Sequence, residues 1–317
     1  MLHVLNGDAT ASVFADAGIA GERLVWRDIL VEGPVPAVPG TPSMATRTAY
    51  LAERLGIDAG AYVRGLEAQT ASLTAARGHD EIVLWFEQDL FCAVSLWSLL
   101  DWFTRHAPDT TLSLVYPAGD DETRGLGAME PSRLAALFAS RQPVAEETRT
   151  LGARAWAAYA GPDPLASAAF VGRETSALAF VGGAFRCHLG RFPSVTNGLN
   201  EVESAALDGL RRERRFFGEL FREVGAHPRV RPHGMGDVQF AACLRGLRPL
   251  LTGGDDALEI TERGRAVVAG DEDWLSIQPI DTWLGGVHLS RHGPLWRWDG
   301  ARSRLVPSQA RPAGYTS

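Results

Sequence analysis

Residues 81–103 read EIVLWFEQDLFCAVSLWSLLDWF, and this stretch decides the predicted fold. Its first six residues, Glu81 to Phe86, are the clearest strand signal in the chain. After Asp89, apolar residues recur through Phe103 and predict a strongly apolar helix. A buried strand that leads directly into a buried helix is the repeating unit of an α/β protein.

Comparable segments lie on both sides of this unit. Further strands are predicted at residues 2–5, 23–26 and 111–116. Helices are predicted at residues 10–17, 44–55, 61–76 and 131–140. Alternating strands and helices predict an α/β fold, with a Rossmann-like parallel sheet domain over residues 1–145. We expect at least four strands, with residues 2–5 and 82–86 as adjacent parallel strands.

The second half of the chain has a different pattern. Residues 146–195 are predicted as a helical connector. Residues 196–317 are predicted as a mostly helical, winged-helix-like domain with a β tail, because three helices precede a hairpin at residues 250–260. A length of 317 residues suits two domains.

Composition excludes several classes of protein. Apolar residues make up 45% of the chain, which excludes disorder as the main state. All 31 basic residues are arginine, so no lysine is present for a Schiff base with pyridoxal phosphate or for a P-loop nucleotide site. The three cysteines are far apart in sequence, which favours neither a zinc cage nor a disulfide framework.

Charge and hydropathy indicate where in the cell the protein acts and whether it binds membranes or nucleic acids. The amino terminus lacks a signal-peptide pattern, and charges interrupt every long apolar stretch, so we expect a cytoplasmic protein without a membrane partner. Residues 1–145 carry 10 Arg against 18 Asp and Glu. Residues 201–270 carry 11 of each, although they include the basic cluster at residues 211–215. This neutrality does not favour a nucleic-acid partner.

Several motifs together resemble a known family. They are MLHVLNGD (1–8), WRDILVEGP (26–34), LWFEQDLF (84–91), GLGAMEPSRLAALF (125–138), HLGRFPSVTNGL (188–199) and the late LGGVHL and WRWD segments. The chain resembles, over nearly its full length, the uncharacterised bacterial family catalogued as domain-of-unknown-function family 1835. The resemblance implies an amino-terminal α/β domain and a helical carboxyl part. The chain departs from the family pattern at Gln88, where the family has His.

Polar clusters follow the predicted strands at one edge of the sheet. Ligands of open parallel sheets bind at the carboxyl ends of the strands, where these clusters gather. The clusters are Asn6-Gly7-Asp8, Arg27-Asp28 with Glu32-Gly33, Glu87-Gln88-Asp89 and Gly119-Asp120-Asp121. We therefore expect Asp8, Arg27, Glu32, Glu87 and Asp89 to converge in one cleft.

Roles follow from residue type. Glu87, Asp89 and Glu32 are the candidate catalytic residues, because carboxylates beside apolar segments have shifted pKa values. The candidate ligand-binding residues are Asn6, Gly7, Asp8, Arg27, Asp28, Gly33 and Gln88. The carboxylates could also hold Mg²⁺, although nothing in their spacing requires a metal or another cofactor.

Structural alternatives stay open at each position. Asp89 could cap the following helix, and Asp8 or Thr10 could cap the first one. Glu87 could form a buried pair with an arginine, and Arg27 with Asp28 a surface pair. Arg124, Gly125 and Gly127 could cradle an anion at the start of the following helix or form a surface loop. His288 and His292 could bind a metal, although a β-like segment would not place them on one helix face, and Cys92 is expected to be a packed core thiol.

The sequence leaves two functional hypotheses open. The favoured one is an enzyme or small-ligand-binding protein that acts on a phosphorylated or amino-bearing small molecule at this rim of the sheet. The alternative is a DNA-binding transcriptional regulator with a winged helix and an α/β sensor domain. The sequence does not predict the oligomeric state.

Overall fold

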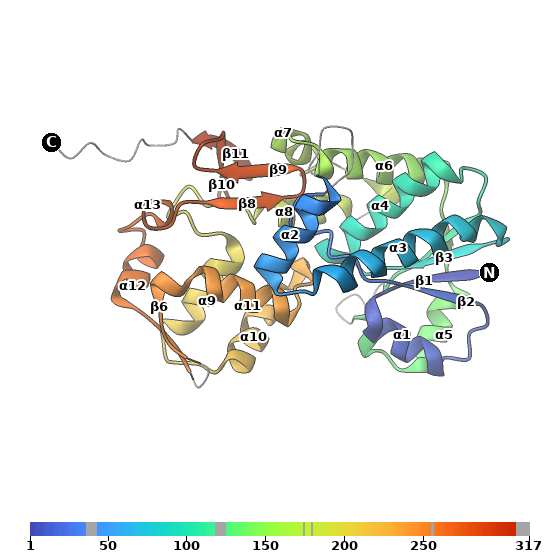
Figure 1. Cartoon of the computed structure of the whole chain (residues 1–317), viewed down its shortest axis with the longest axis horizontal. Coiled ribbons are helices and arrows are strands. Elements are labelled where there is room, and N and C mark those ends of the chain that lie inside the picture. Colours follow the sequence, from blue (N-terminus) through green and yellow to red (C-terminus); the bar gives the residue numbers. More distant parts are fainter. Residues whose placement is uncertain (36–42, 118–124, 174, 179, 255–256, 309–317) are drawn as a thin grey trace. The chain divides into compact units, whose positions relative to one another are not determined.

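The computed structural model describes residues 1–35, 43–117, 125–173, 175–178, 180–254 and 257–308 (Figure 1). The chain divides into two compact units. Unit 1 comprises Met1–Val31, Ile57–Tyr159 and Glu174–Val181, and unit 2 comprises Glu32–Gly56, Ala160–Arg173 and Gly182–Ser317. The segment 146–195, predicted as a connector, is therefore divided between the units.

Unit 1 is built around a five-stranded sheet with the strand order β2-β1-β3-β4-β5. The strands are β1 (Leu2–Asn6), β2 (Glu22–Trp26), β3 (Ile82–Trp85), β4 (Leu112–Val115) and β5 (Gln142–Pro143). The first four run parallel, and β5 is antiparallel to β4. The predicted pairing of the first and third strands is confirmed, with Leu2 opposite Ile82. The two-residue β5 was not predicted, because so short a segment has no periodicity.

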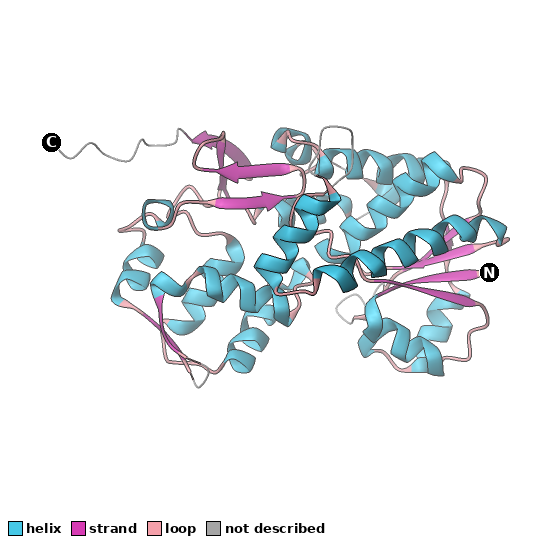
Figure 2. Ribbon diagram, in the orientation of Figure 1, coloured by secondary structure: helices cyan, strands magenta, loops and turns pink. Residues whose placement is uncertain are grey.

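Helices cover both faces of this sheet (Figure 2), which confirms the predicted α/β class. Helices α1 and α5 lie on one face, and α3 and α4 lie on the other. The helices of unit 1 are α1 (Gly7–Asp16), α3 (Ala59–Ala75), α4 (Leu90–His106), α5 (Pro131–Ala139) and α6 (Glu146–Ala160). Short 3₁₀ turns occur at η1 (Ala76–Gly78), η3 (Leu126–Ala128) and η4 (Ser176–Leu178).

The core of unit 1 explains why its central strands are apolar throughout. Every residue of β3 and β4 is buried, as expected for parallel strands that have helices on both faces. On one face, Val83 and Trp85 pack with Phe14 of α1 and Leu134 of α5. Each such side chain contributes about 1.5–3 kcal/mol to folding, so the sheet is a rigid platform for residues at its edge.

Unit 2 contains the remaining helices and three two-stranded sheets. Its helices are α2 (Met44–Leu55), α7 (Pro164–Ala168), α8 (Val181–Leu189), α9 (Glu201–Leu210), α10 (Phe217–Ala226), η5 (Arg231–His233), α11 (Asp237–Gly246), η6 (Arg248–Leu250), α12 (Glu262–Ala269) and α13 (Trp274–Ile277). The antiparallel strand pairs are β6 (Leu251–Gly253) with β7 (Leu258–Ile260), β8 (Asp281–Leu284) with β9 (Val287–Ser290), and β10 (Leu295–Asp299) with β11 (Arg304–Ser308).

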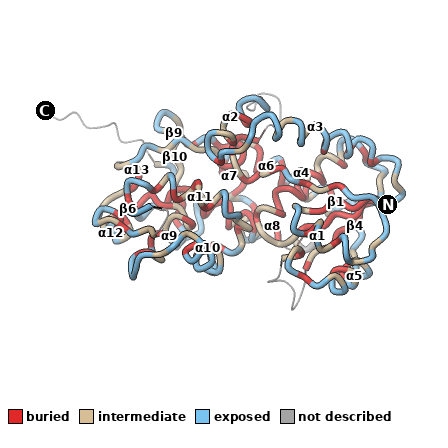
Figure 3. Tube along the Cα trace, turned by 60° about the horizontal axis from the view of Figure 1, so that its bottom comes forward, coloured by how far each residue is buried: buried red, intermediate tan, exposed pale blue. Residues whose placement is uncertain are grey.

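Two apolar clusters stabilise unit 2 (Figure 3). The larger one joins α9, α10 and α11 through residues such as Leu207, Leu220 and Phe240. The smaller one packs Phe192 with buried residues of the β8–β9 and β10–β11 pairs, such as Leu289 and Trp298. Among the described residues of both units, no helix has the length and apolar character needed to cross a membrane.

Candidate functional site

The candidate site lies at the carboxyl ends of β1 and β3, where the strand order reverses. β1 pairs with β2 on one side and β3 on the other, so the chain leaves the sheet in opposite directions there. Ligands of doubly wound sheets bind in the crevice that this reversal opens. Asn6 ends β1, and Glu87 and Asp89 follow β3, so three of the predicted residues lie at this edge.

Glu87 is held by a backbone amide and not by a cation. Its Oε1 accepts a hydrogen bond of 2.8 Å from the Leu126 N–H, at the start of η3. A Cβ at the preceding Gly125 would lie only 3.3 Å from Oε2, so the glycine permits this close approach. Within the described part of the chain, no basic side chain pairs with Glu87. Burial and the nearby Asp89 raise the pKa of Glu87 to about 7.

Asp89 is the N-cap of α4, so the structural alternative that we considered for it is realised. Its Oδ1 accepts a hydrogen bond of 2.8 Å from the Cys92 N–H. Burial raises the pKa of Asp89, although hydrogen bonds from the Cys92 backbone and thiol oppose that shift. Capping does not remove Asp89 from the site, because its charge is one cause of the raised pKa of Glu87.

Cys92 connects this carboxylate pair to the end of β1. Its thiol is buried, as predicted, and hydrogen bonds to Asp89. The side-chain amide of Asn6 donates to Cys92 Sγ across 2.8 Å. Sequence analysis assigned Cys92 to packing alone. Its position three residues after a helix-capping aspartate was the signal that could have placed it beside the carboxylates.

Asn6 contributes an unsatisfied acceptor to the same place. Its Oδ1 is buried, and no group among the described residues donates to it. The side chain makes no capping bond to α1, although Asn6 is the N-cap of that helix. A buried acceptor without a donor costs about 1–3 kcal/mol, which a bound ligand or water would recover.

The cluster has oxygen donors that suit a hard cation. Ligand atoms of Glu87, Asp89 and Cys92 lie within 4.8 Å of one another. Burial and the two carboxylates raise the pKa of the Cys92 thiol well above its ordinary value, so the sulfur stays protonated and is a poor metal ligand. The oxygens of Glu87 and Asp89 fit Mg²⁺, which binds one or two carboxylates and keeps several waters.

Asp8 and Arg27 form an exposed ion pair at the same edge of the sheet. Arg27 Nη2 lies 2.6 Å from Asp8 Oδ1, and Nε lies 3.0 Å from both carboxylate oxygens. Arg27 thus pairs with Asp8 and not with its neighbour Asp28. Asp28 is buried and accepts a hydrogen bond of 2.8 Å from the Tyr62 hydroxyl.

Gln88 and Gly7 have local roles. Gln88 Nε2 donates to the Pro117 carbonyl across 3.0 Å, which ties the segment after β3 to the one after β4. Gly7 has a φ of +78°, a conformation that L side chains rarely adopt. A Cβ there would have open space within 4 Å, so the backbone angle and not crowding requires glycine.

Glu32 and Gly33 belong to unit 2. Glu32 Oε1 lies 2.9 Å from Arg191 Nη2 and 3.2 Å from Gln239 Nε2. Gly33 has a φ of +71°, and a Cβ there would lie 2.8 Å from the Tyr50 ring. The predicted residues therefore fall into three groups: Glu87 with Asp89 and Asn6, Asp8 with Arg27, and Glu32 with Arg191.

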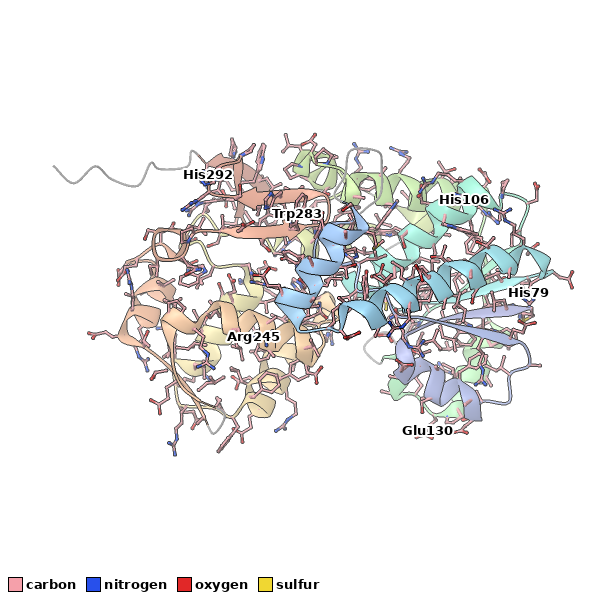
Figure 4. The ribbon with its side chains drawn as sticks, viewed as in Figure 1. His79, His106, Glu130, Arg245, Trp283 and His292 are labelled. Atoms are coloured by element: carbon pink, nitrogen blue, oxygen red, sulfur yellow. The ribbon has the colours of Figure 1, made fainter. Side chains whose placement is uncertain are left out.

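The remaining predicted positions are either structural or outside the described residues. Gly127 packs against Ala9 of α1, because a Cβ there would lie 2.6 Å from the Ala9 Cβ. The His288 ring stacks on Trp283 with the ring centroids 4.3 Å apart, and His292 accepts a hydrogen bond from Arg291 (Figure 4 labels Trp283 and His292). The predicted polar cluster at residues 119–121 and Arg124 lie outside the described residues.

Comparison with known proteins adds no identification. No protein-family model matches the chain, and no curated protein matches it. The resemblance to family 1835 therefore stays a prediction. The geometry of the site carries the functional argument.

Proposed function

We propose that unit 1 carries the active site of an enzyme that uses Glu87 as a general acid or base on a small molecule. The observation that supports this most is a mostly buried carboxyl group with a pKa of about 7 and no cationic partner among the described residues. A general base works best when its pKa lies near the operating pH. Keeping such a group in place costs stability, which favours a functional role over a structural one.

The expected ligand is a phosphorylated or amino-bearing small molecule. Asn6 Oδ1 is an acceptor without a donor among the described residues, and Asn6 and Glu87 both lie near Cys92 Sγ, so amino or hydroxyl groups of the ligand would be the matching donors. The first backbone amides of α1 lie next to Asn6, and a helix amino terminus attracts phosphate. Arg27 stands at the same edge as a further anion contact.

The proton would move at Glu87. The Leu126 N–H holds Oε1, which leaves Oε2, next to Gly125, as the atom that takes or gives the proton. Burial and the Asp89 charge raise the pKa of Glu87 to about 7, so the carboxyl group exchanges protons near neutral pH. If Mg²⁺ binds, Glu87 and Asp89 would hold it, and the ion would polarise a ligand oxygen.

A thermal-shift screen tests this proposal. Nucleotides, sugar phosphates, Mg²⁺ and Mn²⁺ are each added to the protein, because a ligand of the folded state raises the melting temperature. The control variant is Glu67→Gln, which changes an exposed glutamate of α3 in the same unit. We expect at least one compound or ion to stabilise the wild type and Glu67→Gln but not Glu87→Gln. An equal response in all three proteins would contradict the site.

We also propose that α9, α10 and α11 with the β6–β7 pair form a winged helix. Three helices followed by a two-stranded antiparallel sheet support this arrangement. Residues 201–270 carry no net charge, so we propose that the domain serves packing or dimerisation and not specific DNA binding.

A mobility-shift assay at physiological salt distinguishes this from the regulator function. We expect no specific complex with genomic fragments. A complex whose affinity falls steeply with salt would support the regulator instead. Its loss would then be tested by replacing the cluster Arg211, Arg212, Arg214 and Arg215.

A further inference from the structure

A hollow of about 1180 Å³ lies within unit 2, and none of its lining residues is proposed for catalysis. Its walls come from α8, α9, the end of α10, α12 and β10. Part of the HLGRFPSVTNGL motif also lines it, through Gly190, Phe192, Ser194, Asn197 and Leu199. The proposed function of unit 1 leaves this motif unexplained.

The acidic residues that line the hollow are all paired with arginines. Each has an arginine partner within 4 Å, although Arg215 is shared between Glu223 and Glu213, which does not line the hollow. The pairs are Glu201 with Arg186, Asp208 with Arg211, Glu223 with Arg215, and Asp299 with Arg302, at 2.6, 3.4, 3.3 and 3.0 Å.

Three further arginines line the hollow without an acidic partner among the described residues. They are Arg212, Arg229 and Arg265. Arg265 Nη1 donates to the Arg211 carbonyl across 2.9 Å, which orients its guanidinium and leaves the charge in place. The hollow therefore has a surplus of positive charge, although residues 201–270 as a whole are neutral. Three unpaired cations around one hollow attract an anion and repel one another.

The indole of Trp298 adds an unsatisfied donor. Trp298 is 2% exposed, and its Nε1 has no acceptor in the described part of the chain. The indole nitrogen borders Gly300, which also lines the hollow, and a Cβ at Gly300 would lie only 3.3 Å from Nε1. A buried donor without an acceptor costs about 1–3 kcal/mol in proteins generally. Nε1 itself is closed to solvent, so the indole reports on the wall of the hollow and is not counted as a direct ligand contact.

We propose that this hollow binds a small soluble ligand that carries two or more phosphate groups. A guanidinium binds a phosphate through two parallel hydrogen bonds, and three guanidinium groups match a polyanion better than a single carboxylate. The cations come from separate segments around a hollow and do not form a stripe along one helix, as a nucleic-acid surface would. Helix α11 and the β6–β7 pair, which a winged helix uses on DNA, contribute no lining residue among those described.

Titration calorimetry with inorganic tripolyphosphate and with ATP, without divalent cations, tests the proposal. The test variant is the triple substitution R212Q/R229Q/R265Q. The matched control is R214Q/R222Q/R248Q, which removes three exposed arginines of the same unit that do not line the hollow. We expect the wild type and the control to bind at least one probe. The test variant should bind about 100-fold more weakly, because it loses charge-assisted hydrogen bonds.

A second readout does not depend on the triple variant. The indole N–H resonance of Trp298, assigned with Trp298→Phe, should shift when the probe binds to the wild type. The proposal is overturned if neither probe binds, if both triple variants lose affinity equally, or if the Trp298 resonance does not respond. Tighter binding of a DNA oligonucleotide than of ATP, lost in the test variant, would assign the hollow to nucleic acid and also overturn it.

Discussion

Glu87 and Glu32 are both mostly buried carboxylates that follow a predicted strand, yet their surroundings differ. Glu32 pairs with Arg191 and also accepts a hydrogen bond from Gln239. Glu87 has one backbone N–H and the like charge of Asp89. Burial alone therefore does not distinguish the two carboxylates. The partner distinguishes them, because a cation stabilises the ionised form and a second carboxylate destabilises it.

An arginine-paired buried glutamate occurs at another position than the one predicted. A buried pair with an arginine was considered for Glu87, and the structure has that arrangement at Glu32. We therefore expect changes at the Glu32 pair to act mainly on stability, and changes at Glu87 to act mainly on ligand response.

The largest effect is expected at the arginine of the Glu32 pair. Arg191→Met should lower the free energy of unfolding by about 3–5 kcal/mol, because it leaves the Glu32 carboxylate buried without its cation. Urea unfolding at pH 7 measures the change. Glu32→Gln in the Arg191→Met background should restore part of the loss. If Arg191→Met unfolds like the wild type, Glu32 is not held by this pair.

Glu87→Gln is expected to raise the free energy of unfolding, in contrast to Arg191→Met. The pKa of Glu87 is about 7 in the folded chain and near 4.5 in an unfolded one, so the folded state holds the extra proton between these values. Stability therefore falls as the pH rises from about 4.5 to 7, and the cost of the ionised group is complete above pH 7. Glu87→Gln should raise the free energy of unfolding by about 1–3 kcal/mol at pH 8 and leave it nearly unchanged at pH 4.

Glu81→Gln is the matched control in the same unit. Arg141 and the Ser113 hydroxyl lower the pKa of Glu81, so its contribution to stability is present at neutral pH and is lost as the pH falls. This variant should lose about 1 kcal/mol at pH 7. A stability loss at pH 8 in both variants would mean that Glu87 is structural.

A smaller effect, on the pKa of Glu87, is expected from Asp89→Asn, which removes the charge of Asp89 but keeps its capping role. Asp89→Asn keeps a side-chain oxygen at the N-cap of α4, and asparagine caps a helix about as well as aspartate. The pKa of Glu87 should move down from about 7, because one cause of its elevation is the Asp89 charge. Carbon-13 NMR of the glutamate carboxyl groups, assigned with Glu87→Gln, measures this titration. An unchanged midpoint would assign the whole shift to burial.

The fold of unit 1 was predictable because each of its signals is local. The apolar runs at β3 and β4 and the cap at Asp89 each lie within a few consecutive residues. The pairing of β1 with β3 then follows from the rules for parallel sheets. Residues 142–143 could not be predicted in this way, because β5 has no local signal and forms only by pairing with the edge of β4.

The site was predictable only in part. The edge of the sheet and the Glu87–Asp89 pair follow from parallel topology. The Leu126 amide and the Asn6 amide lie 39 and 86 residues from their partners, and no local pattern encodes such contacts. Arg27 was grouped with the adjacent Asp28, yet packing buries Asp28 against Tyr62 and leaves Asp8 within reach of Arg27. Sequence neighbours on a strand end point in different directions, so side-chain partners need the tertiary structure.

The smallest stability effect is expected at the Asp8–Arg27 pair, and it sharpens the contrast with the buried pair. The two side chains are 71% and 55% exposed, so water and salt screen their attraction. Asp8→Asn should change the free energy of unfolding by at most about 0.5 kcal/mol, although the two groups approach to 2.6 Å. Urea unfolding at low and at high salt should therefore give nearly the same small difference.

Ligand binding should respond to the same pair in a way that stability does not. If the ligand found in the thermal-shift screen carries a phosphate at the amino terminus of α1, Asp8→Asn should strengthen its binding, because a competing carboxylate is removed from Arg27. Arg27→Gln should weaken binding at similar stability. Two variants with near-wild-type unfolding and opposite effects on affinity would place Arg27 in the ligand site. Equal affinities in both would leave Asp8 and Arg27 as a surface pair and confine the site to Asn6, Glu87 and Asp89.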